Sequence, residues 1–254
     1  MAESIENHNY TNLWVENFSQ KDVERYNSKW FKKFEKNAKH LEQVEVLKKY
    51  LSSSKLWLDA PVGSGRFYFE ILHDKSKYFA LDNSNVFLKY VKKKFNLADE
   101  NLFKMNLYDI KIKKKKFDLI SCFNTLFALN NIDKILKNFK NILSEDGILI
   151  FDVKYNSSKM KTGESDYKHF TKDEITKIIK QLNLELLEII EHDFYDSKWF
   201  NNKKNSKVLL IKILFKIIYG FLNLIYKIPL FKSLFLNLQK MGFKKEKMIV
   251  VCKK

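Results

Sequence analysis

Glycine and proline are scarce in this chain, and three of them stand within five positions. The 254 residues include six glycines and two prolines, and Pro61, Gly63 and Gly65 form the only close cluster. A short apolar run, residues 56–60, precedes the cluster, and a segment with helical spacing, residues 66–73, follows it. A backbone break between a buried strand and a helix is typical of an open α/β sheet, where this loop faces a ligand.

The rest of the chain continues this alternation of apolar runs and helical patterns. We expect helices at residues 20–51, 66–73, 86–95, 132–143 and 171–182, the last with Thr171 and Glu174 as a capping box. We expect strands at residues 56–60, 78–81, 102–105, 117–123, 148–153, 184–195 and 248–252. Strands that alternate with helices predict one α/β domain with a mostly parallel sheet covered on both faces.

The positive charge of the chain is concentrated near its C-terminal end. Lys and Arg number 47 against 30 acids, a net charge of +17, and residues 197–254 hold 14 lysines and a single acid, Glu246. Only Arg25 and Arg66 are arginines. Because arginine is the preferred side chain for phosphate and guanine, this composition argues against specific nucleic-acid recognition.

The cysteines and the N-terminal residues bear on the compartment. Cys122 and Cys252 lie 130 positions apart, which excludes a disulfide framework or a cysteine zinc site and fits a reducing cytosol. We expect no metal. The first ten residues lack the basic and apolar regions of a secretory signal. A cytoplasmic protein is therefore expected.

An acid follows the glycine cluster at the distance that a nucleoside site needs. Asp82 ends the second expected strand, 17 residues after Gly65, and a carboxylate there can accept hydrogen bonds from both ribose hydroxyls. A dinucleotide fingerprint would need a third glycine where Tyr68 stands. This disfavours a nicotinamide cofactor, although an NAD-dependent oxidoreductase stays open as an alternative.

The order Asp59-x-Pro61-x-Gly63-x-Gly65 resembles motif I of the class I S-adenosylmethionine-dependent methyltransferases. Further stretches at residues 82, 105–107, 117–124 and 143–149 resemble the family's later motifs in the same order. The resemblance implies a Rossmann-like sheet of seven strands whose last strand is antiparallel. It also implies S-adenosyl-L-methionine as cofactor, bound by Asp59, Ala60, Gly63, Gly65, Asp82, Asn83, Asn106, Leu107 and Phe123.

The family pattern also divides the chain into expected regions. Residues 1–54 would form a helical cover, 55–195 the cofactor-binding core, 196–246 an inserted block and 247–254 the last strand. In this pattern Asn106 meets the adenine or is only a turn residue. Asp152, His169 and Tyr26 are the candidates for a general base.

The inserted block combines a broad apolar surface with lysines. In residues 208–228 the polar or small residues fall on one narrow helical stripe, and the longest run without lysine is ten residues, 217–226. That run is too short to span a membrane, which needs roughly 20 apolar residues. The block is expected either to pack as a lid, or as a contact in a homodimer, or to lie on an anionic membrane surface.

The expected reaction is methyl transfer to a small metabolite, a sugar or a lipid-linked acceptor, on oxygen or nitrogen. Residues 123–126 read Phe-Asn-Thr-Leu and lack the Asn-Pro-Pro-Tyr type of motif that serves amino groups of nucleic-acid bases. A non-catalytic membrane- or nucleic-acid-binding module on a degenerate fold is the remaining alternative.

Overall fold

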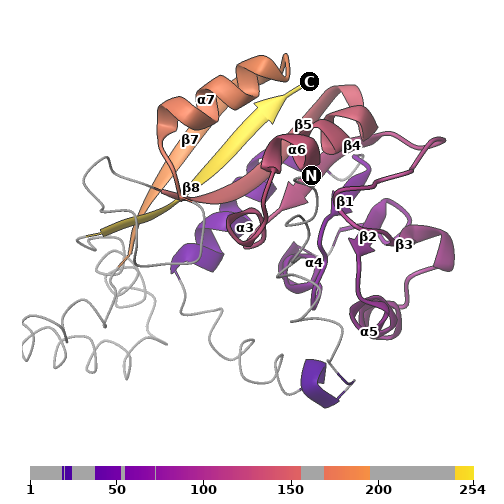
Figure 1. The fold of residues 1–254 in the computed structure, drawn as a ribbon. Helices are drawn as coiled ribbons and strands as arrows, with labels where there is room; N and C mark the ends of the chain where they lie inside the picture. The colour runs from indigo at the N-terminus through magenta and orange to yellow at the C-terminus, as the bar shows by residue number, and fades with distance from the viewer. Residues whose placement is uncertain are drawn as a thin grey trace, which may run out of the picture.

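A mostly parallel sheet forms the centre of the molecule (Figure 1). The computed structural model describes residues 19, 21–24, 38–52, 55–71, 73–155, 169–194 and 244–254. The strand order is β3-β2-β1-β4-β5-β8-β7, and a two-residue strand, β6, pairs with β5. The strands are β1 (Trp57–Asp59), β2 (Tyr78–Asp82), β3 (Leu102–Lys104), β4 (Phe117–Cys122), β5 (Leu143–Tyr155), β6 (His169–Phe170), β7 (Glu185–Phe194) and β8 (Lys244–Lys253).

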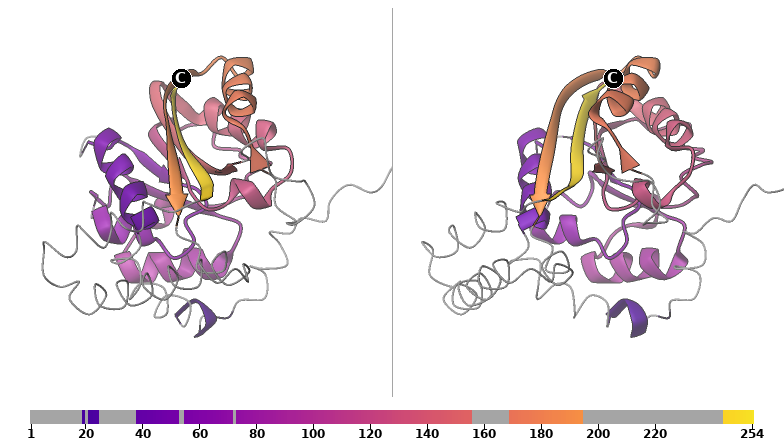
Figure 2. Two further views of the ribbon diagram at one scale, coloured as in Figure 1. Left: turned by 90° about the vertical axis from the view of Figure 1, so that its left-hand side faces the viewer. Right: turned by 60° about the vertical axis from the view of Figure 1, so that its left-hand side comes forward.

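The last strand is the antiparallel one, as expected. β8 pairs antiparallel with both β5 and β7, whereas β1 to β5 pair in parallel. Figure 2 shows β8, drawn in yellow, alongside β7. β7 therefore runs in the same direction as β5, and it ends at the edge of the sheet where β8 begins. The Rossmann-like fold class predicted from the sequence is confirmed.

Helices cover both faces of this sheet. One face packs against α3 (Ala38–Tyr50), α4 (Arg66–Ile71) and α5 (Asn85–Phe95), and the other against α6 (Ile132–Ile142) and α7 (Lys172–Gln181). Two short 3-10 helices, η1 (Asp99–Asn101) and η2 (Leu126–Ala128), lie in the connections. Successive strand residues point to opposite faces, so Trp57 joins the first core and Leu58 the second.

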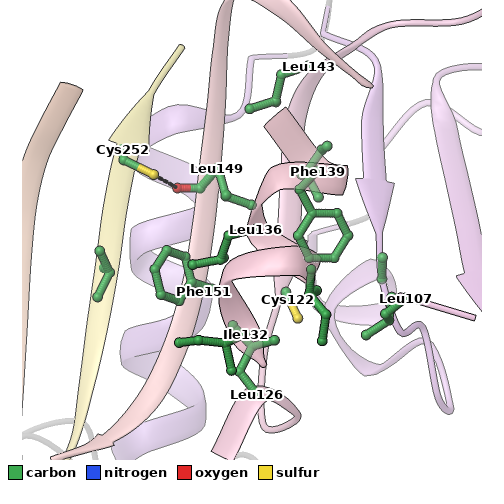
Figure 3. Close-up of a cluster of buried hydrophobic side chains, with 14 of the residues drawn as sticks. Leu107, Cys122, Leu126, Ile132, Leu136, Phe139, Leu143, Leu149, Phe151 and Cys252 are labelled. Atoms are coloured by element: carbon green, nitrogen blue, oxygen red, sulfur yellow. Dashed lines mark hydrogen bonds between the residues drawn. The ribbon is translucent and has the colours of Figure 1, made fainter. Parts of the chain in front are cut away.

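Helix α6 shows how the apolar pattern builds the second core. Its buried residues recur at helical spacing and include Ile132, Leu136 and Phe139. Figure 3 shows these side chains in one buried cluster with Phe151 of β5. The thiol of Cys252 in β8 donates to the carbonyl of Leu149 at 3.7 Å. Both cysteines are free and buried.

The helix caps agree with the sequence. At α7 the Thr171 hydroxyl accepts from the amide of Glu174, and the Glu174 carboxylate accepts from the amide of Thr171. At α5 the Ser84 side chain accepts from the amide of Phe87. Each of the two helices is therefore N-capped by the side chain of the residue that precedes it.

Some expected boundaries are wrong. β5 begins at Leu143, five residues before the expected start of this strand at residue 148, and the pairing with β4 shifts register there. Ser144 donates to the Asp118 carboxylate at 3.0 Å, so this stretch stays bound to its neighbour. β8 starts at Lys244 rather than at residue 247 or 248.

Other predictions fall outside the residues that the structure describes. They concern Tyr26, residues 196–243 of the inserted block and residues 25–37 of the expected first helix. The described parts of that expected helix, residues 21–24 and 38–50, are helical. Among the described residues, no helix is long and apolar enough to cross a membrane.

Candidate cofactor-binding site

The glycine loop leaves β1 at the carboxyl edge of the sheet and is held on both sides by backbone bonds. The amide of Ala60 donates to the carbonyl of Ser121 on β4 at 2.9 Å, and that of Val62 to the carbonyl of Leu81 on β2 at 2.8 Å. The amide of Gly65 donates back to Val62 at 3.0 Å as α4 begins. The loop is therefore fixed between the two neighbouring strands before any ligand arrives.

Glycine is required at the two positions of this loop for different structural reasons. Both have positive φ, +49° at Gly63 and +67° at Gly65, which other residues adopt at a cost. A Cβ at Gly63 would have no atom within 4 Å, so Gly63 borders open space. A Cβ at Gly65 would lie 2.4 Å from Cε2 of Phe95. Gly65 lets α5 pack closely, whereas Gly63 leaves room beside the loop.

Asp82 closes this space from the end of β2. Its Oδ2 accepts from the amide of Gly63 and its Oδ1 from the amide of Ser84, both at 2.9 Å. The side chain is 5% exposed, and burial raises the pKa of this carboxyl to about 6 despite the amides, which favour the charged form. A carboxylate has lone pairs beyond these two bonds, so Asp82 keeps the capacity to bind ribose hydroxyls. Asn83, the next residue, is exposed.

Asp59, the first residue of the motif, lies inside the sheet layer. Its Oδ1 accepts from the Ser121 hydroxyl at 2.9 Å, and its Oδ2 accepts from Tyr78 at 3.3 Å. Burial raises the pKa of Asp59 to about 7, opposed by the Ser121 bond and the charge of Arg66. Its contacts thus join β1 to β2 and β4, and any contact with the cofactor stays a prediction.

The adenine region predicted at Asn106 and Leu107 follows β3. The Asn106 side chain accepts from the amide of Tyr108 at 3.0 Å, which is an Asx turn. Leu107 is buried in the second core, and its carbonyl accepts from Asn138 at 2.9 Å. This geometry favours the turn-residue interpretation of Asn106, and an adenine contact stays a prediction.

Two aromatic rings connect the end of β4 to the glycine loop. Phe123 follows β4 and lies with its ring centroid 4.8 Å from that of Phe67 on α4. The Arg66 guanidinium lies over the same Phe67 ring at 4.3 Å. Phe123 is thus beside the loop, as its predicted role requires.

Asp152 is fully buried and has several partners. Its Oδ2 accepts from Gln43 on α3 at 3.0 Å and from Lys247 on β8 at 3.1 Å, and its Oδ1 accepts from the amide of Asn124. Gln43 in turn accepts from Arg66 at 3.1 Å. Both of its oxygens already accept hydrogen bonds and one of them is ion-paired, so these contacts favour a structural role over the predicted catalytic one.

Of the other two candidate bases, one can be placed. His169 lies in β6, half-buried, opposite Lys154 at the carboxyl end of β5. Tyr26 lies outside the described residues. The structure therefore puts His169 at the same edge of the sheet as the glycine loop, and its role in catalysis stays a prediction.

Sequence reasoning did not find that Gln43, Asn124 and Lys247 contact Asp152. Lys247 is 7% exposed and shares a face of β8 with Ile249 and Val251. The alternation of β8 placed it inward, and this was visible only once the strand was known to begin before Met248. In the described part of the chain, no cluster of acids, histidines and cysteines suits a metal ion.

The site fits S-adenosylmethionine by its own features. The space beside Gly63, the carboxylate of Asp82 and the apolar rings of Phe67 and Phe123 provide room, a ribose acceptor and an apolar wall. Residues 58–151 match the family model of a methyltransferase domain. The match covers the glycine loop, Asp82 and the end of β4.

Solved structures with the same fold agree with this match. A possible histamine N-methyltransferase from Thermotoga maritima is 14% identical, with 92% of this chain and 96% of that chain covered and a TM-score of 0.55. The N-methyltransferase NodS from Bradyrhizobium japonicum, in complex with S-adenosyl-L-homocysteine, is 11% identical, with 85% and 87% covered and a TM-score of 0.51.

The [4+2]-cyclase SpnF is also similar, at 11% identity, with 84% of this chain and 80% of that chain covered and a TM-score of 0.53. At these identities the structures show the fold, and the fold alone does not select a reaction. No curated protein matches the chain in sequence. The likeness to methyltransferases in sequence therefore depends on the domain match over residues 58–151.

Proposed function

We propose that the chain is a class I S-adenosylmethionine-dependent methyltransferase whose acceptor is a small metabolite, a sugar or a lipid-linked molecule. The hydrogen bond from the Gly63 amide to Asp82 is the main support for this cofactor. It holds the carboxylate that we expect to bind the ribose beside the open side of the loop. When bound, the cofactor supplies a methyl group on a sulfonium. The chain's own residues provide binding and orientation.

The end of β4 argues for the acceptor class. Phe123 to Leu126 occupy the place where enzymes acting on nucleic-acid amino groups carry an Asn-Pro-Pro-Tyr type of motif. Asn124 and Thr125 are followed here by η2, whose Leu126 is fully buried. A turn built this way supports a small or lipid-linked acceptor over a base in a duplex.

The chain connectivity supports a role for the inserted block at the site. Phe194, the last residue of β7, pairs with Lys244, the first of β8, at the same carboxyl edge as the glycine loop. Residues 195–243 therefore leave and rejoin the core on the side of the cofactor. We propose that their lysines and apolar residues bring this edge to an anionic membrane surface in the cytoplasm.

The test is methyl transfer from cofactor labelled with tritium in the methyl group. The purified protein is incubated with total lipid extract or with aqueous metabolites, and calorimetry measures S-adenosyl-L-homocysteine binding. We expect binding and labelling of one extract. Gly63→Val should lose both, because the side chain would enter the open space beside the loop and strain a positive φ. A wild-type protein that binds no cofactor product and labels neither extract would contradict the proposal.

A further inference from the structure

A compact polar cluster joins the ends of β4, β5 and β8 beside the glycine loop. Nζ of Lys247 lies 3.1 Å from Oδ2 of Asp152 and 2.9 Å from Oδ1 of Asn124. The amide nitrogen of the Asn124 backbone donates to Oδ1 of Asp152. Lys247 also lies over the ring of Phe127, 4.3 Å from its centroid. The lysine therefore holds both the carboxylate and the asparagine side chain.

The lysine fixes which way the Asn124 amide faces. An ammonium group has three donors and no acceptor, so only the amide oxygen can face it, and Nδ2 must point away. The backbone of Asn124 has φ +55°, and the turn places its side chain between Lys247 and the end of β4. The group that Asn124 leaves available is a hydrogen-bond donor.

This donor is buried without a partner. In the part of the chain that the structure describes, no group accepts a hydrogen bond from Nδ2 of Asn124. An unsatisfied buried donor destabilises the folded state, and native proteins seldom keep one. The preceding residue, Phe123, packs on Phe67 at the start of α4, directly after the glycine loop. The residue that carries this donor therefore follows one that contacts the start of the helix at the cofactor loop.

We infer that Nδ2 of Asn124 donates a hydrogen bond to an oxygen of the methyl acceptor, and that Lys247 is the positioning residue for this amide. The inference rests on the proposed function and narrows it to oxygen-bearing acceptors methylated on oxygen. An oxygen nucleophile has two lone pairs and can accept from Asn124 with one while attacking with the other. A neutral amine has one lone pair, which the attack itself needs.

The methyl transfer needs no oxidant, reductant or further reactant. A lone pair of the acceptor hydroxyl forms the new carbon–oxygen bond while the carbon–sulfur bond breaks, and sulfur keeps that electron pair. The sulfonium becomes a neutral thioether, and the hydroxyl proton leaves to water. The asparagine donor orients the oxygen and takes no proton.

The first test reads the chemistry of the product. Label transferred by the wild type to the extract is heated with hydriodic acid, under conditions that release methyl iodide from methyl ethers and esters but leave N-methyl groups intact. We expect the label to become volatile. Label that stays with the product would overturn the inference while leaving methyl transfer itself established. Absence of both labelling and cofactor binding would instead overturn the proposed function.

The second test reads the donor. Asn124→Gly keeps the positive φ but removes the amide, and Asn124→Asp keeps the shape and the lysine contact but replaces the donor by an acceptor. Both substitutions should lower the labelling of the extract by about tenfold, the effect of one lost hydrogen bond. The affinity for S-adenosyl-L-homocysteine should stay unchanged. Lys253→Met is the matched control, because Lys253 lies on β8 like Lys247 but pairs with Asp146 at the other end of that strand. Wild-type labelling by Asn124→Asp would overturn the inference.

The third test reads the position of the amide without activity. In protein labelled with ¹⁵N-asparagine, the side-chain signal missing from Asn124→Gly belongs to Asn124. Lys247→Met combined with Asp152→Asn removes both buried charges, so that neither is left unpaired. We expect this signal to shift in the double variant and to stay in Lys253→Met. An unchanged signal in the folded double variant would remove Lys247 from the positioning role.

Discussion

At the scale of single residues, Asp82 contacts the glycine loop and is the residue predicted to bind the ribose of the cofactor. Replacing it by alanine removes a charged acceptor and also frees the amide of Gly63. We expect Asp82→Ala to weaken S-adenosylmethionine binding by about 1.5–3 kcal/mol, the usual value of a hydrogen bond to a charged group. Calorimetry measures this, with Asp99→Ala as control, since Asp99 pairs with Lys92 at the surface. Equal affinities of wild type and Asp82→Ala would remove the residue from the site.

The raised pKa of Asp82 predicts a pH dependence of binding. Below about pH 6 the carboxyl takes up a proton, loses its charge and becomes a weaker hydrogen-bond acceptor for the two amides. Cofactor affinity, followed by calorimetry between pH 5 and 8, should therefore fall as the pH falls through about 6. Asp82→Asn should bind more weakly and with a flatter profile. A profile that keeps its slope in this variant would point to another group, such as Asp59.

The effect of the same two carboxyls on stability has the opposite sign. Burial raises both pKa values above those of the unfolded chain, so the folded state holds these protons more tightly. Their contribution to the free energy of unfolding is fully present below about pH 4 and is lost as the pH rises through about 6 and 7. The two carboxyls therefore contribute least to the stability of the ligand-free protein at the pH where the cofactor is expected to bind best.

At the scale of elements, the packing of α4 against α5 depends on Gly65. Gly65→Ala should lower the free energy of unfolding by about 1–3 kcal/mol from overpacking, in addition to the strain of positive φ, because its Cβ would meet Phe95. Gly63→Ala carries the same φ strain with no such contact and is the matched control. Urea unfolding of both variants gives the difference, and equal losses would show that the close approach of Phe95 is relieved without cost.

The sequence predicted those elements whose pattern is local. The apolar run of β2, the spacing of α6 and the capping box of Thr171 each depend on neighbours within a few residues, and each is confirmed. The start of β5 and the inward face of Lys247 depend on which strand lies alongside, and they were missed. The partners of Asp152 come from α3, β8 and the turn after β4, so no spacing in the sequence brings them together.

At the scale of the whole molecule, the lysines of the inserted block should govern membrane binding. Replacing Lys212, Lys216 and Lys227 by Glu reverses three charges and should abolish flotation with vesicles that contain anionic lipid, at unchanged cofactor affinity. The matched control replaces Lys111, Lys113 and Lys114 by Glu; these precede β4 at the amino edge of the sheet. Wild-type protein that floats with neither anionic nor neutral vesicles would favour a lid or a dimer contact.

The position of β8 has a consequence for how the protein is made. β8 fills the place between β5 and β7, although its residues, 244–253, are synthesised after both. While the nascent chain is still emerging from the ribosome, β5 and β7 have no shared neighbour, and each presents an open edge of the kind that recruits other strands. The sheet is therefore completed only after translation of its final strand, and the Lys247–Asp152 pair forms in that same closing event.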